Sequence, residues 1–226
     1  MEEIVRLFDI LASLIAILIF WPLMVIVAIA IKLESKGPVL FKQKRLTKGI
    51  KEFNIYKFRS MRTDFDKDGV GVQVKGGSNA ITKVGKFIRK TKLDELPQLF
   101  NVLFGDMAII GPRAELPRRL PAYTEWEKEI FVVRSGISST ASIVFSDEEY
   151  LMDQVEDPEK FYMEQIRPYK IKLNHYYIRN KSFGYDIWLI IATVLKILGK
   201  IDNKQVMKDE ELLREHETLV KATKNY

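Results

Sequence analysis

The sequence contains no cysteine and only two histidines, and these absences limit the chemistry it can support. Without cysteine there is no disulfide framework and no thiolate metal site, which fits a reducing compartment. His175 and His216 each lack a second ligand at metal-motif spacing. Metalloprotease and zinc-hydrolase chemistry is therefore not expected, and both histidines are interpreted as surface or packing residues. No internal repeat is present.

Charge is distributed unevenly along the 226 residues, which carry a formal net charge of +6. The first 120 residues hold 21 Lys and Arg against 12 Asp and Glu, whereas the remainder holds 15 against 18. The basic half is expected to face acidic material, such as lipid headgroups, nucleotide phosphates or nucleic acid. The acidic second half and the lack of an RNA- or DNA-binding motif argue against nucleic acid.

Ile10 to Ile31 is an uncharged run of 22 residues, long enough to cross a bilayer core. It is too long for a signal-peptide core, and Glu2 and Glu3 offset the positive charge of Arg6 before it. A basic cluster follows, made of Lys32, Lys36, Lys42, Lys44, Arg45, Lys48 and Lys51. By the positive-inside rule this cluster predicts that the C-terminal side lies in the cytoplasm.

Hydropathy alone favours an ordinary spanning helix for this run, but Pro22 lies near its middle. Proline removes a backbone donor and kinks a helix. Arg6 and Asp9 also lie at the N-terminal edge, where they need water or headgroups. A re-entrant helix that enters and leaves on one face would accommodate these features, so both paths are open at this point.

The remaining chain predicts alternating short strands and helices. Periodicity and turn residues indicate strands at 39–41 and 53–59, a basic helix at 81–90, a helix at 121–133, a turn region at 134–142, an amphipathic helix at 158–180 interrupted at Pro168, and an apolar helix at 187–198. The last helix is too short to span, and burial and membrane-interface placement are equally open to it. The expected organisation is a membrane segment at 1–35, a catalytic domain at 36–200 and a charged tail at 201–226. A solvated, frayed helix is expected in the tail, although Leu212 and Leu219 leave a partner helix open.

Two adjacent carboxylates, Asp94 and Glu95, precede an apolar helix that starts at Pro97 and ends in Gly105. A helix N-terminus holds anions and is expected to keep a nearby aspartate ionised. A strand then leads to the turn Gly111–Arg113. This arrangement suits phosphate chemistry, although an isolated Asp-Glu pair is most often a solvated helix start.

Four cations could serve such a site: Lys57, Arg59, Arg89 and Arg113. Lys57 and Arg59 are expected on one face of a strand, with Phe58 on the other. Each cation alone is open to a surface or a ligand role. Two further motifs fail, because the calcium-like Asp64–Gly69 has Lys75 where a bidentate Glu is needed, and Gly69–Gly71 lacks the last glycine of a dinucleotide fingerprint.

Three strings in the sequence resemble motifs of the bacterial sugar transferases, the monotopic phosphoglycosyl transferases. They are KLDELPQLFNVLFGDMAIIGPRAE at 92–115, KFRSM at 57–61 and SFGYD at 182–186. The resemblance extends through about Ile197. It implies a compact, helix-rich α/β (α+β) catalytic domain with interfacial amphipathic helices. It also favours a re-entrant membrane helix, with Pro22 at the break, on the cytoplasmic face of the bacterial inner membrane.

The resemblance implies transfer of a phospho-sugar from a UDP-sugar to undecaprenyl (polyprenyl) phosphate, the first membrane step of a glycoconjugate pathway. Asp94 is then the nucleophile that expels UMP and forms an aspartyl phospho-sugar, and Asp94 with Glu95 would hold Mg²⁺. Lys57, Arg59, Arg89 and Arg113 would bind the diphosphate, because guanidinium groups grip phosphate oxygens in pairs. Pro112 would support the site, and Asp186 is open to a structural or an active-site role.

The sequence departs from the family pattern at Arg134–Ser146, and Ala114 replaces a usual proline. This departure affects the part expected to read the nucleotide or sugar. A catalytically inactive membrane scaffold that binds nucleotide sugars is therefore the alternative. The sugar, the exact polyprenol and the oligomeric state are not fixed by the sequence, with which a homodimer is compatible.

Overall fold

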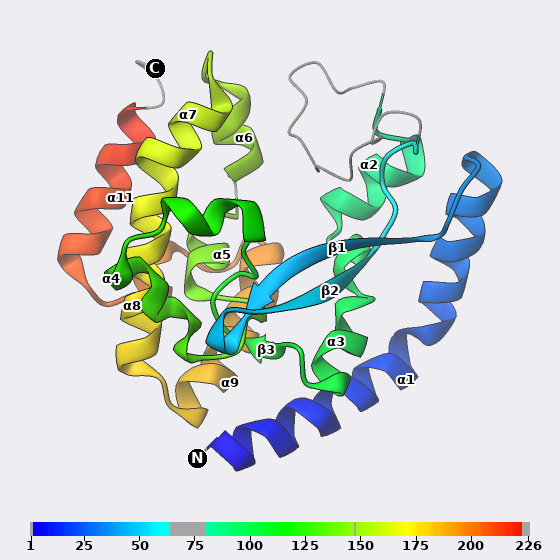
Figure 1. Ribbon diagram of the computed structural model, residues 1–226, viewed down its shortest axis with the longest axis horizontal. Coiled ribbons are helices and arrows are strands. Elements are labelled where there is room, and N and C mark those ends of the chain that lie inside the picture. Colours follow the sequence, from blue (N-terminus) through cyan, green and yellow to red (C-terminus); the bar gives the residue numbers. More distant parts are fainter. Residues whose placement is uncertain (1, 64–79, 147, 223–226) are drawn as a thin grey trace. The chain divides into compact units, whose positions relative to one another are not determined.

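The computed structural model describes residues 2–63, 80–146 and 148–222 (Figure 1). The calcium-like Asp64–Gly69 and the Gly69–Gly71 motif lie outside these ranges. The predicted helix-rich α/β class is confirmed, with short strands between many helices. Two compact units divide the chain. The first unit is Met1–Leu46 with Lys51–Ala108, and the second is Thr47–Ile50 with Ile109–Tyr226.

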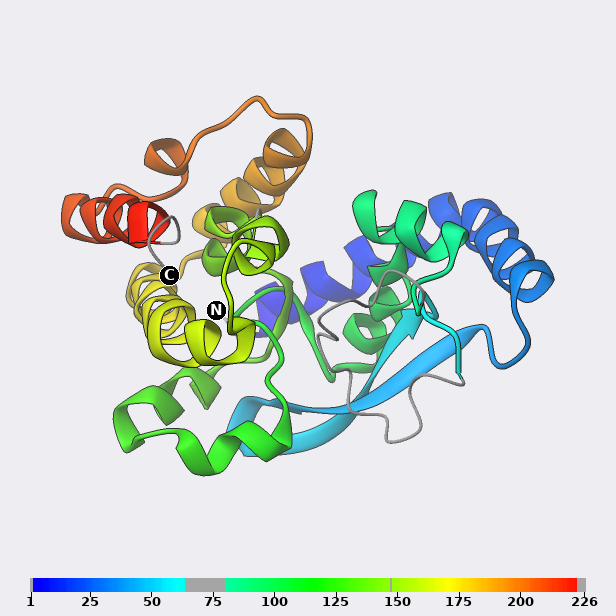
Figure 2. The ribbon, with the colours of Figure 1, turned by 90° about the horizontal axis from the view of Figure 1, so that it is seen from above.

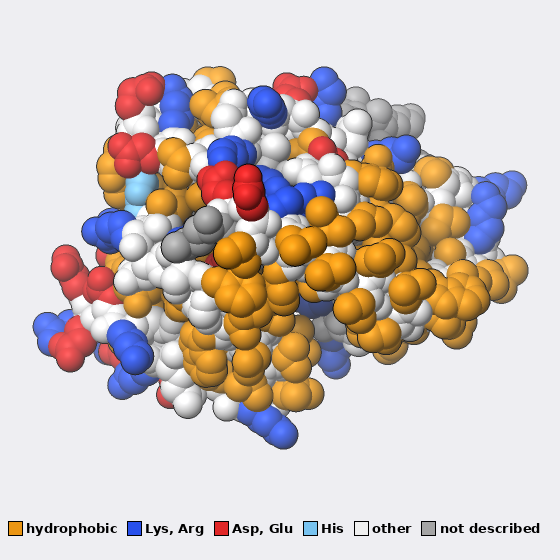
Figure 3. Space-filling view, turned by 90° about the horizontal axis from the view of Figure 1, so that it is seen from below, with side chains coloured by type: hydrophobic (Ala, Val, Ile, Leu, Met, Phe, Trp, Pro, Cys, Tyr) orange, Lys and Arg blue, Asp and Glu red, His pale blue; other side chains and the backbone are white. Residues whose placement is uncertain are grey.

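The first unit begins with α1, a single apolar helix of 33 residues from Glu2 to Glu34. Its length and composition are sufficient to cross a membrane. Most of its large apolar side chains are exposed, and hydrophobic side chains gather along the surface it contributes (Figure 3). Pro22 lies inside the helix, and α1 changes direction partway along its length (Figure 1). A re-entrant path stays a prediction.

The rest of the first unit is a β-hairpin and two short helices beside α1. These elements are β1 (Leu40–Thr47), β2 (Lys51–Phe58), α2 (Lys83–Lys90) and α3 (Gln98–Phe104), which confirm the predicted strands and basic helix. Gly49, at the turn of the hairpin, has a φ of 70°, which suits glycine. Val27 and Ile31 of α1 pack with Phe58 and Ile88, so α1 shares its core with β2 and α2.

Both ends of α1 are tied to the first unit by charged side chains. Near the N-terminus, Arg6 donates to the carbonyls of Val102 (2.5 Å) and Leu103 (2.8 Å) in the last turn of α3. At the other end, the Glu34 carboxylate accepts from the backbone N–H groups of Lys83 (2.6 Å) and Val84 (2.9 Å), which open α2. These contacts satisfy helix-end groups that have no partner within their own helix.

The second unit contains one small sheet and a set of mostly short helices. In chain order its elements are β3 (Ala108–Ile110), η4 (Pro117–Ala122), α4 (Glu125–Lys128), η5 (Glu129–Val132), β4 (Gly136–Ser138), α5 (Thr140–Val144), α6 (Glu148–Asp153), α7 (Pro158–Phe161), a π-helical turn (Tyr162–Ile166), α8 (Arg167–Asn180), α9 (Phe183–Ile197), α10 (Asn203–Val206) and α11 (Glu210–Ala222). The strands β3 and β4 pair with each other.

Three local expectations in this unit were not met. The helix predicted at 121–133 is divided, because Thr124 and Glu127 form a reciprocal capping box that starts a new helix at Glu125. The turn region predicted at 134–142 contains β4 and the start of α5, where Ser139 caps the helix. The helical run continues through Pro168, which comes two residues after the π-helical turn Tyr162–Ile166 that the run contains.

The tail was also expected to be solvated, and this was wrong. The helix α11 lies beside α8 in both ribbon views (Figures 1 and 2). Leu212 and Leu219 are both buried, and the Tyr169 hydroxyl donates to the Leu212 carbonyl (2.5 Å). His216 stacks on Tyr169, and His175 stacks on Trp126, so of the surface and packing roles left open for the histidines the structure shows packing.

Candidate active site

Asp94 and Glu95 lie in a single 3₁₀ turn, Leu93–Glu95, between α2 and α3. Lys92 precedes the turn in the left-handed region, with a φ of 58°. This unusual backbone for a non-glycine residue reverses the chain sharply after α2. The chain then continues through Pro97 into α3, which ends at Gly105 with a φ of 96°. The two carboxylates therefore occupy a tight corner between two short helices.

Asp94 is a buried carboxyl group, with 9% of the residue exposed. Burial is the largest influence on its pKa and raises it. Lys57, Lys92 and Arg89 oppose this change, while the negative charge of Glu95 adds to it, and the net result is a raised pKa. Burial thus acts against the ionised form that a helix end was expected to favour, and ionisation of Asp94 stays a prediction.

Glu95 forms a short ion pair with Lys57, with 2.6 Å between Lys57 Nζ and Glu95 Oε1. Both side chains are about one-sixth exposed, so water screens this pair only in part. Lys57 lies on β2, and its charge also acts on Asp94. The structure thus brings together three of the residues expected at the site from two distant parts of the sequence.

Arg89, in the last turn of α2, is close enough that its charge lowers the pKa of Asp94. Arg59 has a different environment. Its guanidinium group donates to the carbonyls of Ser35 (2.8 Å) and Lys36 (2.7 Å) and to the Ser35 hydroxyl (2.9 Å). Arg59 therefore holds the chain that follows α1. Phosphate binding by Arg59 and Arg89 stays a prediction.

A buried asparagine that the sequence analysis missed joins β2 to α3, the helix that follows Asp94 and Glu95. Asn101, in α3, accepts a hydrogen bond from the Tyr56 N–H (2.9 Å) and donates to the Asn54 carbonyl (2.8 Å). It completes the edge of β2 next to Lys57, much as a neighbouring strand would. A polar residue inside the apolar run of α3 was the signal that could have revealed this role, since buried polar groups are generally hydrogen-bonded.

The Gly111–Arg113 turn lies in the second unit, at the end of β3. A side chain at Gly111 would collide with the Arg134 carbonyl, and the Gly111 N–H donates to the Ser138 carbonyl (3.0 Å). The Pro112 carbonyl accepts from the Gly136 N–H (2.9 Å), and Arg113 bridges to Gly136. Pro112 thus has a supporting position, while convergence of Arg113 with Asp94 stays a prediction.

Asp186 lies in the first turn of α9 and is buried. It accepts a hydrogen bond from the Tyr177 hydroxyl (2.7 Å), which also donates to the Ile110 carbonyl (3.3 Å). Asp186 therefore connects α9 to α8 and to the strand before Gly111. This geometry gives Asp186 a structural role in supporting the Gly111–Arg113 turn.

The segment that departs from the family pattern is well packed. Ser139 and Thr140 are almost completely buried, and the Ser138 hydroxyl is 2.7 Å from that of Thr193 in α9. The Thr140 hydroxyl lies 3.3 Å from that of Tyr185. The hydroxyl residues of this segment therefore attach β4 and α5 to α9.

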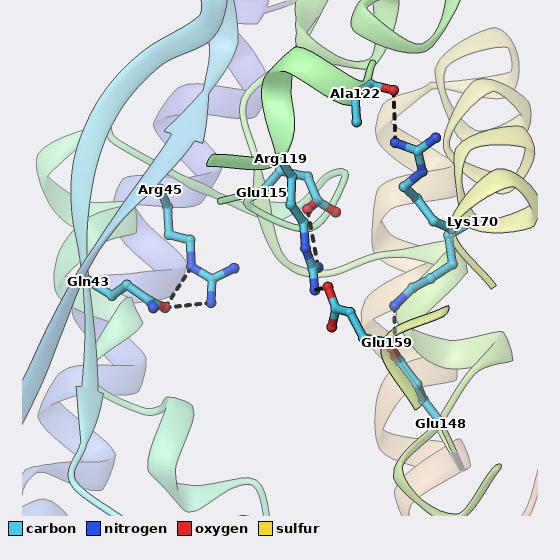
Figure 4. A network of polar contacts seen from close by, with 9 residues as sticks. Gln43, Arg45, Glu115, Arg119, Ala122, Glu148, Glu159 and Lys170 are labelled. Atoms are coloured by element: carbon cyan, nitrogen blue, oxygen red, sulfur yellow. Dashed lines mark hydrogen bonds and ion pairs between the residues drawn. The ribbon is translucent and has the colours of Figure 1, made fainter. Parts of the chain in front are cut away.

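A second polar cluster that the sequence analysis missed follows the Gly111–Arg113 turn (Figure 4). Arg119 lies between the carboxylates of Glu115 (4.0 Å) and Glu159 (3.4 Å), and its guanidinium stacks on the ring of Tyr162 (4.4 Å). Lys170 pairs with Glu148 at 2.7 Å. Burial is the main cause that raises the pKa of Tyr162 above its ordinary range, so its hydroxyl stays protonated. Figure 4 also shows Arg45 of β1 donating to Gln43 (2.7 Å).

The family model of the bacterial sugar transferases matches residues 1–200. The chain belongs to this family. The match includes α1, the Asp94–Glu95 turn, the Gly111–Arg113 turn and α9. Family membership confirms the resemblance carried by the three sequence motifs.

Curated relatives agree with this assignment. The chain is 41% identical over 198 residues to a UDP-N-acetylgalactosamine-undecaprenyl-phosphate N-acetylgalactosaminephosphotransferase of Aeromonas hydrophila, covering 84% of this chain and 42% of that protein. It is 36% identical to a UDP-glucose:undecaprenyl-phosphate glucose-1-phosphate transferase of Xanthomonas campestris pv. campestris, covering 85% and 38%. The exopolysaccharide production protein PSS of Rhizobium leguminosarum bv. phaseoli is 38% identical, with 86% and 95% covered. The chain thus spans about two fifths of the length of the first two.

Proposed function

We propose that this protein is a membrane-bound sugar-1-phosphate transferase that moves a phospho-sugar from a UDP-sugar to undecaprenyl phosphate. The observation that carries the proposal is the Asp94–Glu95 turn, in which Asp94 is buried near the charges of Lys57 and Arg89, in a chain of this family. Relatives named for undecaprenyl-phosphate sugar phosphotransfer support the donor and acceptor classes. The product would start a polysaccharide or another glycoconjugate.

In the proposed reaction the Asp94 carboxylate attacks the β-phosphorus of the UDP-sugar. The bond between the two phosphates breaks, UMP leaves, and an aspartyl phospho-sugar remains. A phosphate oxygen of undecaprenyl phosphate then attacks the same phosphorus and releases Asp94, leaving a lipid-linked diphosphosugar. The covalent intermediate divides one difficult transfer into two displacements.

Burial affects both the nucleophilicity and the pKa of Asp94. A carboxylate removed from water is a stronger nucleophile than a solvated one, and the raised pKa moves the ionisation of Asp94 to higher pH. The cationic neighbours Lys57, Lys92 and Arg89 favour the ionised form and would also attract a diphosphate. The acid limb of the pH–rate profile should therefore lie above the ordinary aspartate range.

The residues at the turn fit a magnesium ion. Asp94 and Glu95 supply hard carboxylate oxygens, and the like charges that raise the pKa of Asp94 would be relieved by a cation. Mg²⁺ typically binds through one or two carboxylates together with substrate phosphates and water, so two protein carboxylates are sufficient. When bound, the ion would neutralise diphosphate charge as UMP leaves. Lys57 holds Glu95 in place for this role.

A panel of UDP-sugars tests the proposed function directly. We expect one or a few of them to release UMP from the purified protein when undecaprenyl phosphate is present, at rates well above those without acceptor. Radiolabelled donor identifies both UMP and the lipid product. An inactive scaffold, the alternative function, would bind a UDP-sugar without releasing UMP from any member of the panel.

The structure also suggests how the protein meets the membrane. Besides α1, the helix α9 buries Leu189 and Ala192 while it exposes Ile191, Val194 and Ile197, so it has apolar side chains on two faces. We propose that its exposed face lies in the membrane interface on the cytoplasmic side of the bacterial inner membrane.

The contacts at the two ends of α1 support a re-entrant path. Arg6 binds α3 and Glu34 binds α2, so both ends of α1 contact the same unit. A straight spanning helix would place its ends on opposite sides of the bilayer. We therefore propose that both ends lie on the cytoplasmic face and that Pro22 sets the bend.

Cysteine labelling tests this topology, because the native chain has no cysteine. A cysteine at Glu2 should be protected from an impermeant maleimide in intact cells and labelled after permeabilisation. Lys90→Cys, on the exposed side of α2, is the matched cytoplasmic control. Labelling of the Glu2 position in intact cells would place the N-terminus outside and refute the re-entrant path. If Pro22→Ala exposes that position, Pro22 enforces the bend.

A further inference from the structure

The membrane helix contacts both ends of the segment that carries the catalytic carboxylates. That segment begins at the first turn of α2, where Lys83 and Val84 donate to Glu34, and ends at the last turn of α3, where Val102 and Leu103 accept from Arg6. The Asp94–Glu95 turn lies between these two points in the chain. One helix thus contacts both ends of the segment.

The contact at α3 is close and specific. Arg6 offers two guanidinium N–H groups to two successive carbonyls, a geometry that lysine cannot copy. A side chain at Gly105 would come within 3.3 Å of the same guanidinium. Arg6 also places its charge at the carbonyl end of α3, where a cation is favoured. This helix has only seven residues, so it depends on such external contacts.

The contact at α2 is equally direct. Glu34 binds two N–H groups at the N-terminus of α2, where an anion is favoured. Burial raises the pKa of Glu34, but hydrogen bonds from Thr82, Val84 and Lys83 outweigh this and lower it overall, so the carboxylate is charged in its capping role. The helix that receives this cap carries Arg89 in its last turn.

A third contact joins the same framework to the partner of Glu95. Arg59 holds Ser35 and Lys36, immediately after α1, and it lies two residues beyond Lys57. Lys57 in turn holds Glu95. The strand β2 is therefore fixed to the end of α1 and to the catalytic turn at the same time.

From these contacts we infer that α1 is part of the catalytic framework, with Arg6 and Glu34 acting as positioning residues for Asp94 and Glu95. This inference rests on the proposed function. In-line attack requires the carboxylate to be placed within a fraction of an ångström, and a displacement of about 1 Å can reduce the rate about a hundredfold. Loss of the Arg6 contact or the Glu34 contact would displace Asp94 and Glu95 without removing either carboxylate.

The test compares Arg6→Gln and Glu34→Gln with the conservative variants Arg6→Lys and Glu34→Asp in lipid nanodiscs. We expect kcat for UMP release to fall about 10- to 100-fold in the two Gln variants, with the KM for donor changed less than about twofold. The conservative variants should recover part of the loss. Glu52→Gln and Arg214→Gln, which alter exposed ion pairs elsewhere, are the matched controls and should resemble the wild type.

Two further measurements separate positioning from general stability. Displacement of Asp94 changes its burial and its distance from Lys57, so the acid limb of the pH–rate profile should shift in the Gln variants. Loss of folded protein would lower the rate at every pH and leave the position of the acid limb unchanged. Hydrogen exchange of residues 83–104 should also accelerate in both variants and not in the controls.

The exchange measurement does not require turnover, so it keeps this inference distinct from the proposed function. A wild-type protein that releases no UMP would refute the function, while faster exchange in Arg6→Gln would still show that α1 positions the catalytic segment. Unchanged kcat, an unchanged acid limb and unchanged exchange in both Gln variants would overturn the inference.

Discussion

Asp94→Asn should abolish UMP release while leaving a folded, membrane-bound protein. The amide has nearly the same volume as the carboxylate, but it has neither the charge nor the nucleophilic oxygen. Removing the residue that forms a covalent intermediate typically lowers the rate by three orders of magnitude or more, and we expect about that loss here. Turnover with labelled donor and undecaprenyl phosphate gives the measurement.

Intact-mass spectrometry provides the complementary result. Wild-type protein incubated with the UDP-sugar and without acceptor should gain the mass of one phospho-sugar, and Asp94→Asn should not. Near-normal turnover in the variant would exclude Asp94 as the covalent residue. An adduct on Asp94→Asn would move the nucleophile to another residue.

The pH dependence of unfolding provides a control for the Asp94→Asn variant, because the burial of Asp94 also affects stability. The folded-state pKa of Asp94 lies above the ordinary value of 3.8, so the folded protein binds the proton more tightly than the unfolded chain. Stability is therefore lost as the pH rises from the ordinary value through the folded-state pKa. Asparagine has no such cost, so Asp94→Asn should unfold at an equal or higher temperature than the wild type at neutral pH. The difference should disappear below about pH 3.8.

Removal of divalent ions should also cause a severe loss of UMP release. In excess EDTA we expect UMP release to fall by at least about a hundredfold, because the diphosphate and the two carboxylates bring several negative charges together. Added Mg²⁺ should restore the rate. The same assay with calcium or manganese reports how closely the site depends on the size of the ion.

Glu95→Gln connects this effect to a residue. It keeps the side-chain volume but removes one hard oxygen charge and the ion pair with Lys57, so half-maximal activity should require more Mg²⁺ than in the wild type. Glu52→Gln, whose exposed carboxylate also pairs with a lysine, should leave the requirement unchanged. Full turnover in EDTA would refute the metal assignment while leaving the nucleophile intact.

Local features of the site were readable from the sequence. The Asp94–Glu95 pair, the helix that ends at Gly105 and the strand before Gly111 follow from residues that act within a few positions of each other. Periodicity likewise predicted β2 and α2, and it placed Phe58 on the face of the strand opposite Lys57; that face packs in the core. These features depend on local backbone preferences and on burial patterns that repeat every two residues in a strand and every three to four residues in a helix.

Features set by distant contacts were not readable. No local rule shows that Arg59 turns to the end of α1 while Lys57 turns to Glu95, because the two targets lie more than 20 residues away in opposite directions along the chain. The pKa of Asp94 depends on burial, which only the assembled fold provides. The apolar spacing of Leu212 and Leu219 was visible, but its partner surface on α8 was not.

The burial of α11 has a consequence for how this family member can be shortened. The family match ends at residue 200, a natural place to cut the gene for expression. That cut would remove Met207, Leu212 and Leu219 and expose the apolar surface of Phe145 and Tyr169 that they cover. The shortened protein would expose a hydrophobic patch and should aggregate, although Asp94 and Glu95 are still present. Purification tags and fusions are therefore better joined after residue 222 than at the family boundary.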